Sequence, residues 1–132
     1  MRGVDTNVLL RLVLADDPNQ VKIVRRLTQE LVRANEPLFA ASIVLCEFVW
    51  VLQRVYKLSR GEIADAIDKL LESNHVTVEH ADETQEALGL YRTGPGDFAD
   101  YLIGLVGRSA GCRDTVTFNR SLAGAEGIAV LR

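Results

Sequence analysis

The sequence predicts an α/β domain with a central, mainly parallel β-sheet flanked by helices. Short apolar runs of strand length alternate with longer helical segments along the chain, which is the pattern of strand–helix–strand units. The 132 residues, 48% hydrophobic and 25% charged, suit one domain, 1–132, with its own core. No linker, repeat or low-complexity stretch divides it.

The predicted strands are short apolar runs bounded by turn-forming residues, and they are residues 2–5, 38–40, 76–79, 115–118 and 128–131. The helices between them are predicted from apolar residues three and four positions apart. These are residues 19–35, 42–56, 59–73, 82–91 and 97–110, and residues 8–14 are predicted to form a short helix or turn. Pro37 separates the helix at 19–35 from the second strand, because proline breaks a helix.

Several helix starts carry capping residues. Ser42 and Asp82 are predicted N-caps, because their side chains can accept the first free backbone N–H groups. Ser59 followed by Glu62 has the spacing of a capping box. A loop containing Gly94, Pro95 and Gly96 precedes the last helix, which Asp97 starts.

Composition excludes several classes of protein. The net charge of −3 argues against a generally basic nucleic-acid binder. No run of about 18 uncharged apolar residues predicts a membrane span, and the first residues lack the anatomy of a signal peptide. Cys46 and Cys112 form neither a CxxC motif nor a Cys/His cluster, so we expect no disulfide framework or zinc site and a cytoplasmic location.

Four carboxylates adjoin apolar runs, namely Asp5, Glu47, Asp97 and Asp100. A charged carboxylate in apolar surroundings is costly without a partner. Asp5 and Asp97 also suit helix N-caps, and Asp100 suits a first helical turn. Glu47 lies mid-helix in a segment that is apolar on every face, so we expect it to need a partner.

A shared divalent cation would supply that partner. Oxygen ligands without nearby His or Cys favour Mg²⁺ or Mn²⁺ over Zn²⁺. Asp97 and Asp100 are three residues apart, and their repulsion is relieved if both serve one metal. Such a site suits hydrolysis of phosphodiester bonds by a metal-activated water.

Four short motifs, in this order and spacing, resemble the PIN domain, and more narrowly the VapC ribonuclease toxins of bacterial toxin–antitoxin pairs. They are Val4-Asp5-Thr6-Asn7-Val8-Leu9-Leu10, Leu45-Cys46-Glu47-Phe48-Val49-Trp50-Val51-Leu52, Asp97-Phe98-Ala99-Asp100-Tyr101-Leu102-Ile103 and Thr117-Phe118-Asn119. The resemblance spans nearly the whole chain. It implies a PIN fold, Mg²⁺- or Mn²⁺-dependent endoribonuclease activity on RNA, and neutralisation by a VapB-type antitoxin.

The resemblance also implies roles for individual residues. Asp5, Glu47 and Asp100 match the metal-binding acids, and Asp97 matches an additional catalytic acid. The fourth motif usually ends in Asp but ends here in Asn119, which adds no charge and implies weaker occupancy of any second metal. The expected polar supports are Thr6, Asn7 and Thr117, and the expected RNA contacts are Arg92, with Arg11, Arg54, Lys57 and Arg120 as further candidates.

Two other classes remain open. One is a non-catalytic binding module with this fold, for which Asn119 is the sequence hint. The other is a phosphoacceptor receiver domain, disfavoured because Asp16 and Asp17 come too late after the first strand and no Lys follows Lys69. The apolar helix 42–56 indicates a homodimer or antitoxin contact, or else a fully buried central helix.

Overall fold

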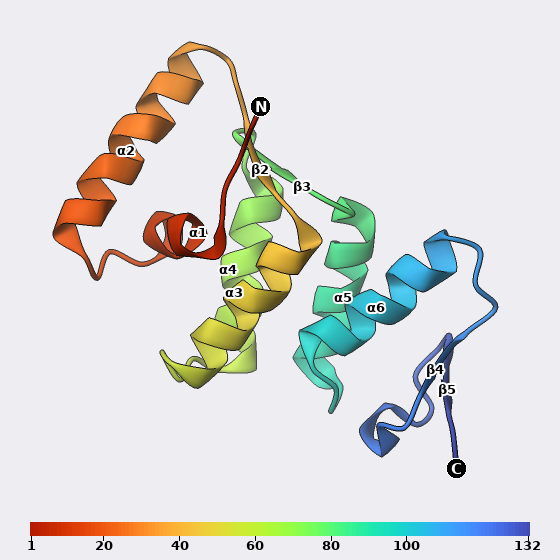
Figure 1. Ribbon diagram of the computed structural model, residues 1–132. Coiled ribbons are helices and arrows are strands. Elements are labelled where there is room, and N and C mark those ends of the chain that lie inside the picture. The colour runs from red at the N-terminus through yellow and green to blue at the C-terminus, as the bar shows by residue number, and fades with distance from the viewer. The chain divides into compact units, whose positions relative to one another are not determined.

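The computed structural model describes all 132 residues, which form two compact units, Met1–Ala81 and Asp82–Arg132 (Figure 1). The expectation of a single domain stays a prediction.

The first unit holds a parallel three-stranded sheet of β1 (Arg2–Gly3), β2 (Leu38–Ala40) and β3 (Val76–Val78), in the order β1-β2-β3. Gly3 pairs with Phe39, and Phe39 pairs with Thr77. Because all three strands run the same way, their carboxyl ends lie at one edge of the sheet. That edge is where parallel α/β folds place their functional groups.

Four helices accompany this sheet: α1 (Thr6–Val13), α2 (Pro18–Arg33), α3 (Ser42–Arg54) and α4 (Arg60–Glu72). Asp5 caps α1, and Asp17 caps α2 with Pro18 in the first turn, as expected from the preference of Asp for N-caps and of Pro for the first helical position. The predicted capping box at α4 is confirmed, with Ser59 Oγ accepting from Glu62 N–H at 3.2 Å.

The core of the first unit contains apolar side chains from every helix and from β2 and β3. Its members include Leu9, Leu10, Val24, Leu38, Leu45, Phe48, Leu52, Ile63, Ile67 and Val78. On α1, α2 and α4 the buried positions recur with helical spacing, as the sequence predicts.

The second unit contains α5 (Ala81–Thr93, apart from its first residue), α6 (Phe98–Ser109), β4 (Thr115–Thr117), a 3₁₀ turn (Arg120–Leu122) and β5 (Ile128–Val130). The two strands pair in parallel, Thr115 with Ile128 and Thr117 with Val130. Tyr91 and Phe98 are fully buried and pack edge to face, with ring centroids 6.3 Å apart, the arrangement that the ring quadrupoles favour.

The α/β class and the parallel strands are confirmed, while some predicted boundaries are wrong. The first strand ends at Gly3 and not at Asp5. Ala41, not Ser42, is the N-cap of α3, because Glu79 Oε1 accepts the Ser42 N–H at 2.9 Å. Asp82 does not cap α5 but lies in its first turn. None of the helices has both the length and the hydrophobicity of a membrane span.

Candidate active site

Asp5 stands just past the carboxyl end of β1 and begins α1. Its Oδ1 accepts the Val8 N–H at 3.0 Å, so the backbone of the first helical turn fixes the carboxylate. The side chain is exposed, and Oδ2 makes no hydrogen bond within the protein. Asp5 is therefore both the N-cap foreseen as an alternative and a carboxylate with an oxygen available to a ligand.

Glu47 is not buried, and the expectation that burial would force it to seek a counter-charge is wrong. The residue is exposed on α3. Its Oε1 accepts a short hydrogen bond from the hydroxyl of Thr6, which is itself buried. Thr6, expected as a polar support, directly follows Asp5 in the chain. Its hydrogen bond fixes the carboxylate of Glu47 near the carboxyl edge of the sheet.

The exposed face of α3 explains why that expectation fails. Ile43 exposes 79% of its surface and Trp50 exposes 54%, and Glu47 lies between them on the helix. Arg54 extends over the Trp50 ring, 6.0 Å from its centroid. The helix is apolar all round in sequence, yet only Leu45, Phe48, Val49 and Leu52 are buried, so it is not a fully buried central helix.

Glu79 is a carboxylate that the sequence did not single out. It follows β3 directly, at the same sheet edge, and accepts the Ser42 N–H. Its carbonyl oxygen accepts the Ser42 hydroxyl at 3.4 Å. The position of Glu79 at the end of a parallel strand is the sequence signal that could have identified it. Its hydrogen bonds to Ser42 show that it also holds the start of α3.

The second unit carries the other two acids at the start of α6. Asp97 occupies the N-cap position, and its backbone N–H donates to Asp100 Oδ2 at 3.0 Å. Asp97 is exposed and Asp100 is half-buried. The pair is therefore ordered by one helix start, and Oδ1 of Asp100 makes no hydrogen bond within the protein.

Asn119 lies beside Asp100 and is held in one orientation. Its Oδ1 accepts from the backbone N–H of Ser121 at 3.0 Å and from the Ser121 hydroxyl at 2.7 Å. A backbone N–H can only donate, so the amide nitrogen must point the other way, and it lies 3.5 Å from Asp100 Oδ2. Thr117 Oγ1 accepts the Asn119 N–H at 3.0 Å and so braces the turn. Asn119 thus orients Asp100 and has its own oxygen engaged.

Within each unit, no three His, Cys, Asp or Glu side chains lie close enough together to hold a cation. The first unit offers Asp5 and Glu47, and the second offers Asp97 and Asp100. Each pair includes a carboxylate oxygen without a hydrogen-bond partner. Hard oxygen donors of this kind fit Mg²⁺ or Mn²⁺, which are bound through one or two carboxylates together with water and phosphate.

Two of the basic residues expected to contact RNA lie on different helices. Arg92 is exposed in the last turn of α5. Arg11 donates from Nη1 to Asp16 Oδ1 and from Nε to Gln20 Oε1, both at 2.6 Å. Tyr56 Oη donates to Asp16 Oδ2 at 2.6 Å. This hydrogen bond, followed by the charge of Arg11, lowers the pKa of Asp16.

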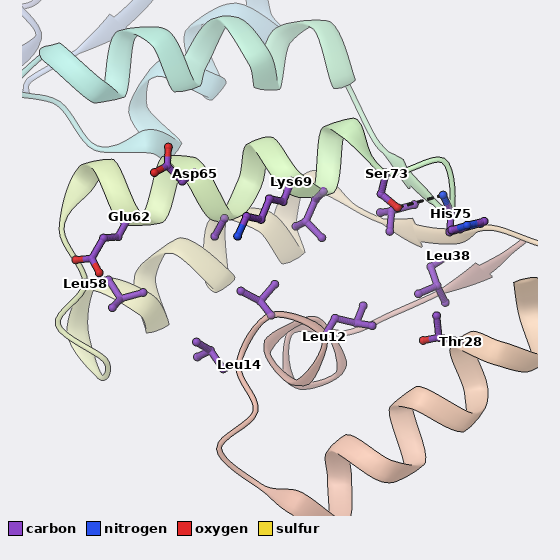
Figure 2. Close-up of a pocket in the computed structure, with 14 residues that line it drawn as sticks. Leu12, Leu14, Thr28, Leu38, Leu58, Glu62, Asp65, Lys69, Ser73 and His75 are labelled. Carbon is purple, nitrogen blue, oxygen red and sulfur yellow. Dashed lines mark hydrogen bonds between the residues drawn. The ribbon is translucent and has the colours of Figure 1, made fainter.

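A cavity of about 700 Å³ in the first unit is lined by other residues than these carboxylates. Leu38 and Val76 line it, and they begin β2 and β3, so the cavity adjoins the amino ends of the strands. Figure 2 shows Leu12, Leu14 and Leu58 around it, with Lys69 extending toward its centre and Glu62 at its rim. It is a largely apolar groove with a few charged groups.

Comparison with known proteins gives two matches. Residues 4–127 match the PIN domain family, and the match includes Asp5, Glu47, Asp97, Asp100 and Asn119. The chain is also 30% identical over 120 residues to a VapC ribonuclease of Aquifex aeolicus (strain VF5). That alignment covers 91% of this chain and 88% of the relative, so the similarity extends through both units.

Proposed function

We propose that this chain, which belongs to the PIN domain family, is a Mg²⁺- or Mn²⁺-dependent endoribonuclease and the toxin of a VapBC-type toxin–antitoxin pair. The relationship to a VapC ribonuclease over 91% of the chain is the observation that carries the proposal. The two carboxylate pairs support it, because they supply the hard oxygen ligands that such an activity requires.

We assign metal binding to Asp5, Glu47 and Asp100, and a further catalytic role to Asp97. When bound, the cation supplies positive charge for the phosphodiester transition state and a nucleophile at neutral pH. The protein's own part is to hold the carboxylates in place. Backbone N–H groups orient Asp5 and Asp100, and the Thr6 hydroxyl orients Glu47.

The same relationship supports a proposal for the partners of the protein. We propose RNA as the substrate, with Arg92 among its contacts, and a VapB-type antitoxin as the inhibitor, acting in the cytoplasm. The largely apolar groove of about 700 Å³ is suited to apolar side chains of the antitoxin. We further propose that the protein is a homodimer, since Ile43 and Trp50 expose apolar surface on α3.

RNA cleavage by the purified protein tests the activity. We expect cleavage with Mn²⁺ or Mg²⁺, none with EDTA, and a loss of at least about 100-fold in Asp5→Asn and Asp100→Asn, because a missing ligand weakens both metal binding and its chemistry. Asp82→Asn is the matched control, as an acid in a first helical turn outside the site. Full cleavage by folded Asp5→Asn protein would contradict the assignment.

The same experiment separates the alternative of a non-catalytic binding module, which Asn119 suggests. Calorimetry with Mn²⁺ alone measures metal binding without RNA. Metal binding with no cleavage of any RNA would favour the binding module, whereas metal binding with cleavage supports the nuclease.

A further inference from the structure

A second, smaller hollow of about 240 Å³ opens between α1 and α2. Asp5 stands at one end of it, and the rest of its lining comes from Asn7, Val8 and Arg11 on α1 and from Gln20, Ile23 and Val24 on α2. Sites for drug-sized ligands start at about 300 Å³, so this hollow suits a single small group. All of these residues belong to the first unit.

Part of the wall of the hollow is apolar. Ile23 exposes 65% of its surface and Val24 is buried, while Val8 on α1 is half-buried. An apolar wall with a few fixed polar groups is how proteins receive a flat heterocycle. Single-stranded RNA presents such groups, because its unstacked bases can turn outward into a protein surface.

The polar lining of the hollow contains hydrogen-bond donors on Arg11 and Gln20, besides the Asn7 amide and the Asp5 carboxylate. Gln20 Oε1 is occupied by Arg11 Nε, so the amide nitrogen of Gln20 is the group left to meet a ligand. The guanidinium of Arg11 has five N–H donors, more than Asp16, Gln20 and Tyr56 use. The Arg11 side chain is 16% exposed, so it is nearly fixed in place.

Residues outside α1 hold the guanidinium of Arg11 in its orientation. Tyr56, beyond the end of α3, holds Asp16, and Asp16 in turn holds Arg11. A donor group held by such a network loses little freedom when it binds a ligand, which favours a specific contact. Asp16 and Tyr56 are thus positioning residues for Arg11.

We propose that this hollow receives one RNA base next to the cleaved phosphodiester, and that Arg11 and Gln20 select guanine over adenine there. Guanine offers two neighbouring acceptors, O6 and N7, to a pair of donors, whereas adenine places an amino donor at the corresponding position. Asp5 at the end of the hollow would put the base beside the reacting phosphate. The inference rests on the proposed ribonuclease function.

Binding of short RNAs in EDTA tests the base site without cleavage. Fluorescence anisotropy would compare two labelled uridine-rich hexamers that differ by a single guanine or adenine. Wild-type protein is expected to bind the guanine hexamer at least about fivefold more tightly, since one good pair of hydrogen bonds gives discrimination of this order. Equal affinities, or no binding of either RNA, would overturn the inference.

The variant Gln20→Glu should abolish the preference, because its carboxylate pairs with Arg11 and replaces the amide donor by an acceptor. Gln29→Glu is the matched control, with the same change of charge at an exposed position of the same helix. If Gln20→Glu discriminates as well as Gln29→Glu, the assignment is wrong. Gln20→Ala, which only removes the donor, serves the same purpose should the glutamate variant fail to fold.

Mapping of cleaved RNA ends with Mn²⁺ present separates this inference from the function on which it rests. Guanine should be enriched beside the cleaved bond in wild-type protein and in Gln29→Glu, but not in Gln20→Glu. Cleavage without guanine enrichment refutes the base site alone. Guanine-selective binding by a protein that cleaves no RNA refutes the nuclease and leaves the base site standing.

Discussion

At the scale of single residues, the candidate site depends on hydrogen bonds that hold carboxylates in fixed directions. Thr6 is the clearest case, because its buried hydroxyl donates to Glu47 from another helix. A residue that orients a metal ligand commonly affects metal affinity by about 10-fold to 100-fold. Thr6 therefore acts as a positioning residue for Glu47.

Replacement of Thr6 by Val removes the hydroxyl and keeps the shape. We expect about a 10-fold loss of Mn²⁺ affinity and of RNA cleavage, measured by calorimetry and by a cleavage assay. Thr6→Ser retains the hydroxyl and should restore both quantities. If valine and serine variants behave alike in a folded protein, the hydrogen bond to Glu47 has no functional role.

The network of Arg11, Asp16 and Tyr56 makes one contribution to stability depend on pH. The Tyr56 hydroxyl and the Arg11 charge lower the pKa of Asp16 in the folded protein. A lowered folded pKa gives stability that is present above the unfolded pKa and is lost as pH falls through the folded value. The Asp16 contribution should thus be full near pH 7 and be lost progressively as the pH falls below about 4.

Thermal unfolding of wild-type protein and Asp16→Asn across this range measures the effect. The wild type should have the higher Tm near neutral pH, and the difference should shrink as the solution is acidified. A difference that stays constant down to about pH 3 would show that the charge of Asp16 is not responsible.

At the scale of elements, the start of α6 is held by the loop before it. The Tyr101 hydroxyl accepts the buried Gly96 N–H at 3.0 Å, which ties the loop to the second turn of the helix. Space there is tight: a Cβ on Gly96 would lie 2.5 Å from Leu122 and 2.9 Å from the Tyr101 ring. Only glycine fits, so the loop conformation that leads into Asp97 is fixed by packing.

Tyr101→Phe leaves the buried Gly96 N–H without its acceptor. We expect a loss of about 1–3 kcal/mol in the free energy of unfolding, measured by denaturant titration. Tyr56→Phe is a control on another tyrosine, whose hydroxyl bonds an exposed carboxylate, and it should lose less. Equal losses in the two variants would contradict the role of the Gly96 hydrogen bond.

At the scale of the whole molecule, the features predicted correctly from the sequence are those that neighbouring residues determine. The capping box at Ser59 and the helical periodicity are properties of neighbouring residues, and both are confirmed. The predicted N-cap of α3, Ser42, is wrong because the group that accepts the Ser42 N–H is the carboxylate of Glu79, which is 37 residues away in the chain. The exposure of Glu47 could not be predicted from the sequence of α3 either. This helix is apolar on every face, so the face that is buried depends on which elements pack against the helix.

Self-association is the prediction that belongs to the whole molecule. If the exposed apolar face of α3 forms the proposed homodimer, Ile43→Asp should convert the protein to a monomer, as seen by sedimentation equilibrium, because a buried charge at an interface is costly. Val32→Asp provides the control, since Val32 is also an exposed apolar residue, but on α2. A monomeric wild type, or a dimer that survives Ile43→Asp, would refute the proposed interface.

The position of Trp50 has a practical consequence. It is the only tryptophan of the chain, and it lies on the exposed face of α3, one turn from Glu47. Residues three apart on a helix are neighbours on its surface, so a paramagnetic ion held by Glu47 would quench the indole emission. Titration with Mn²⁺ should dim this intrinsic fluorophore while Glu47→Gln protein stays bright. The chain thus contains its own optical reporter of cation occupancy, which needs neither a label nor a nucleic acid.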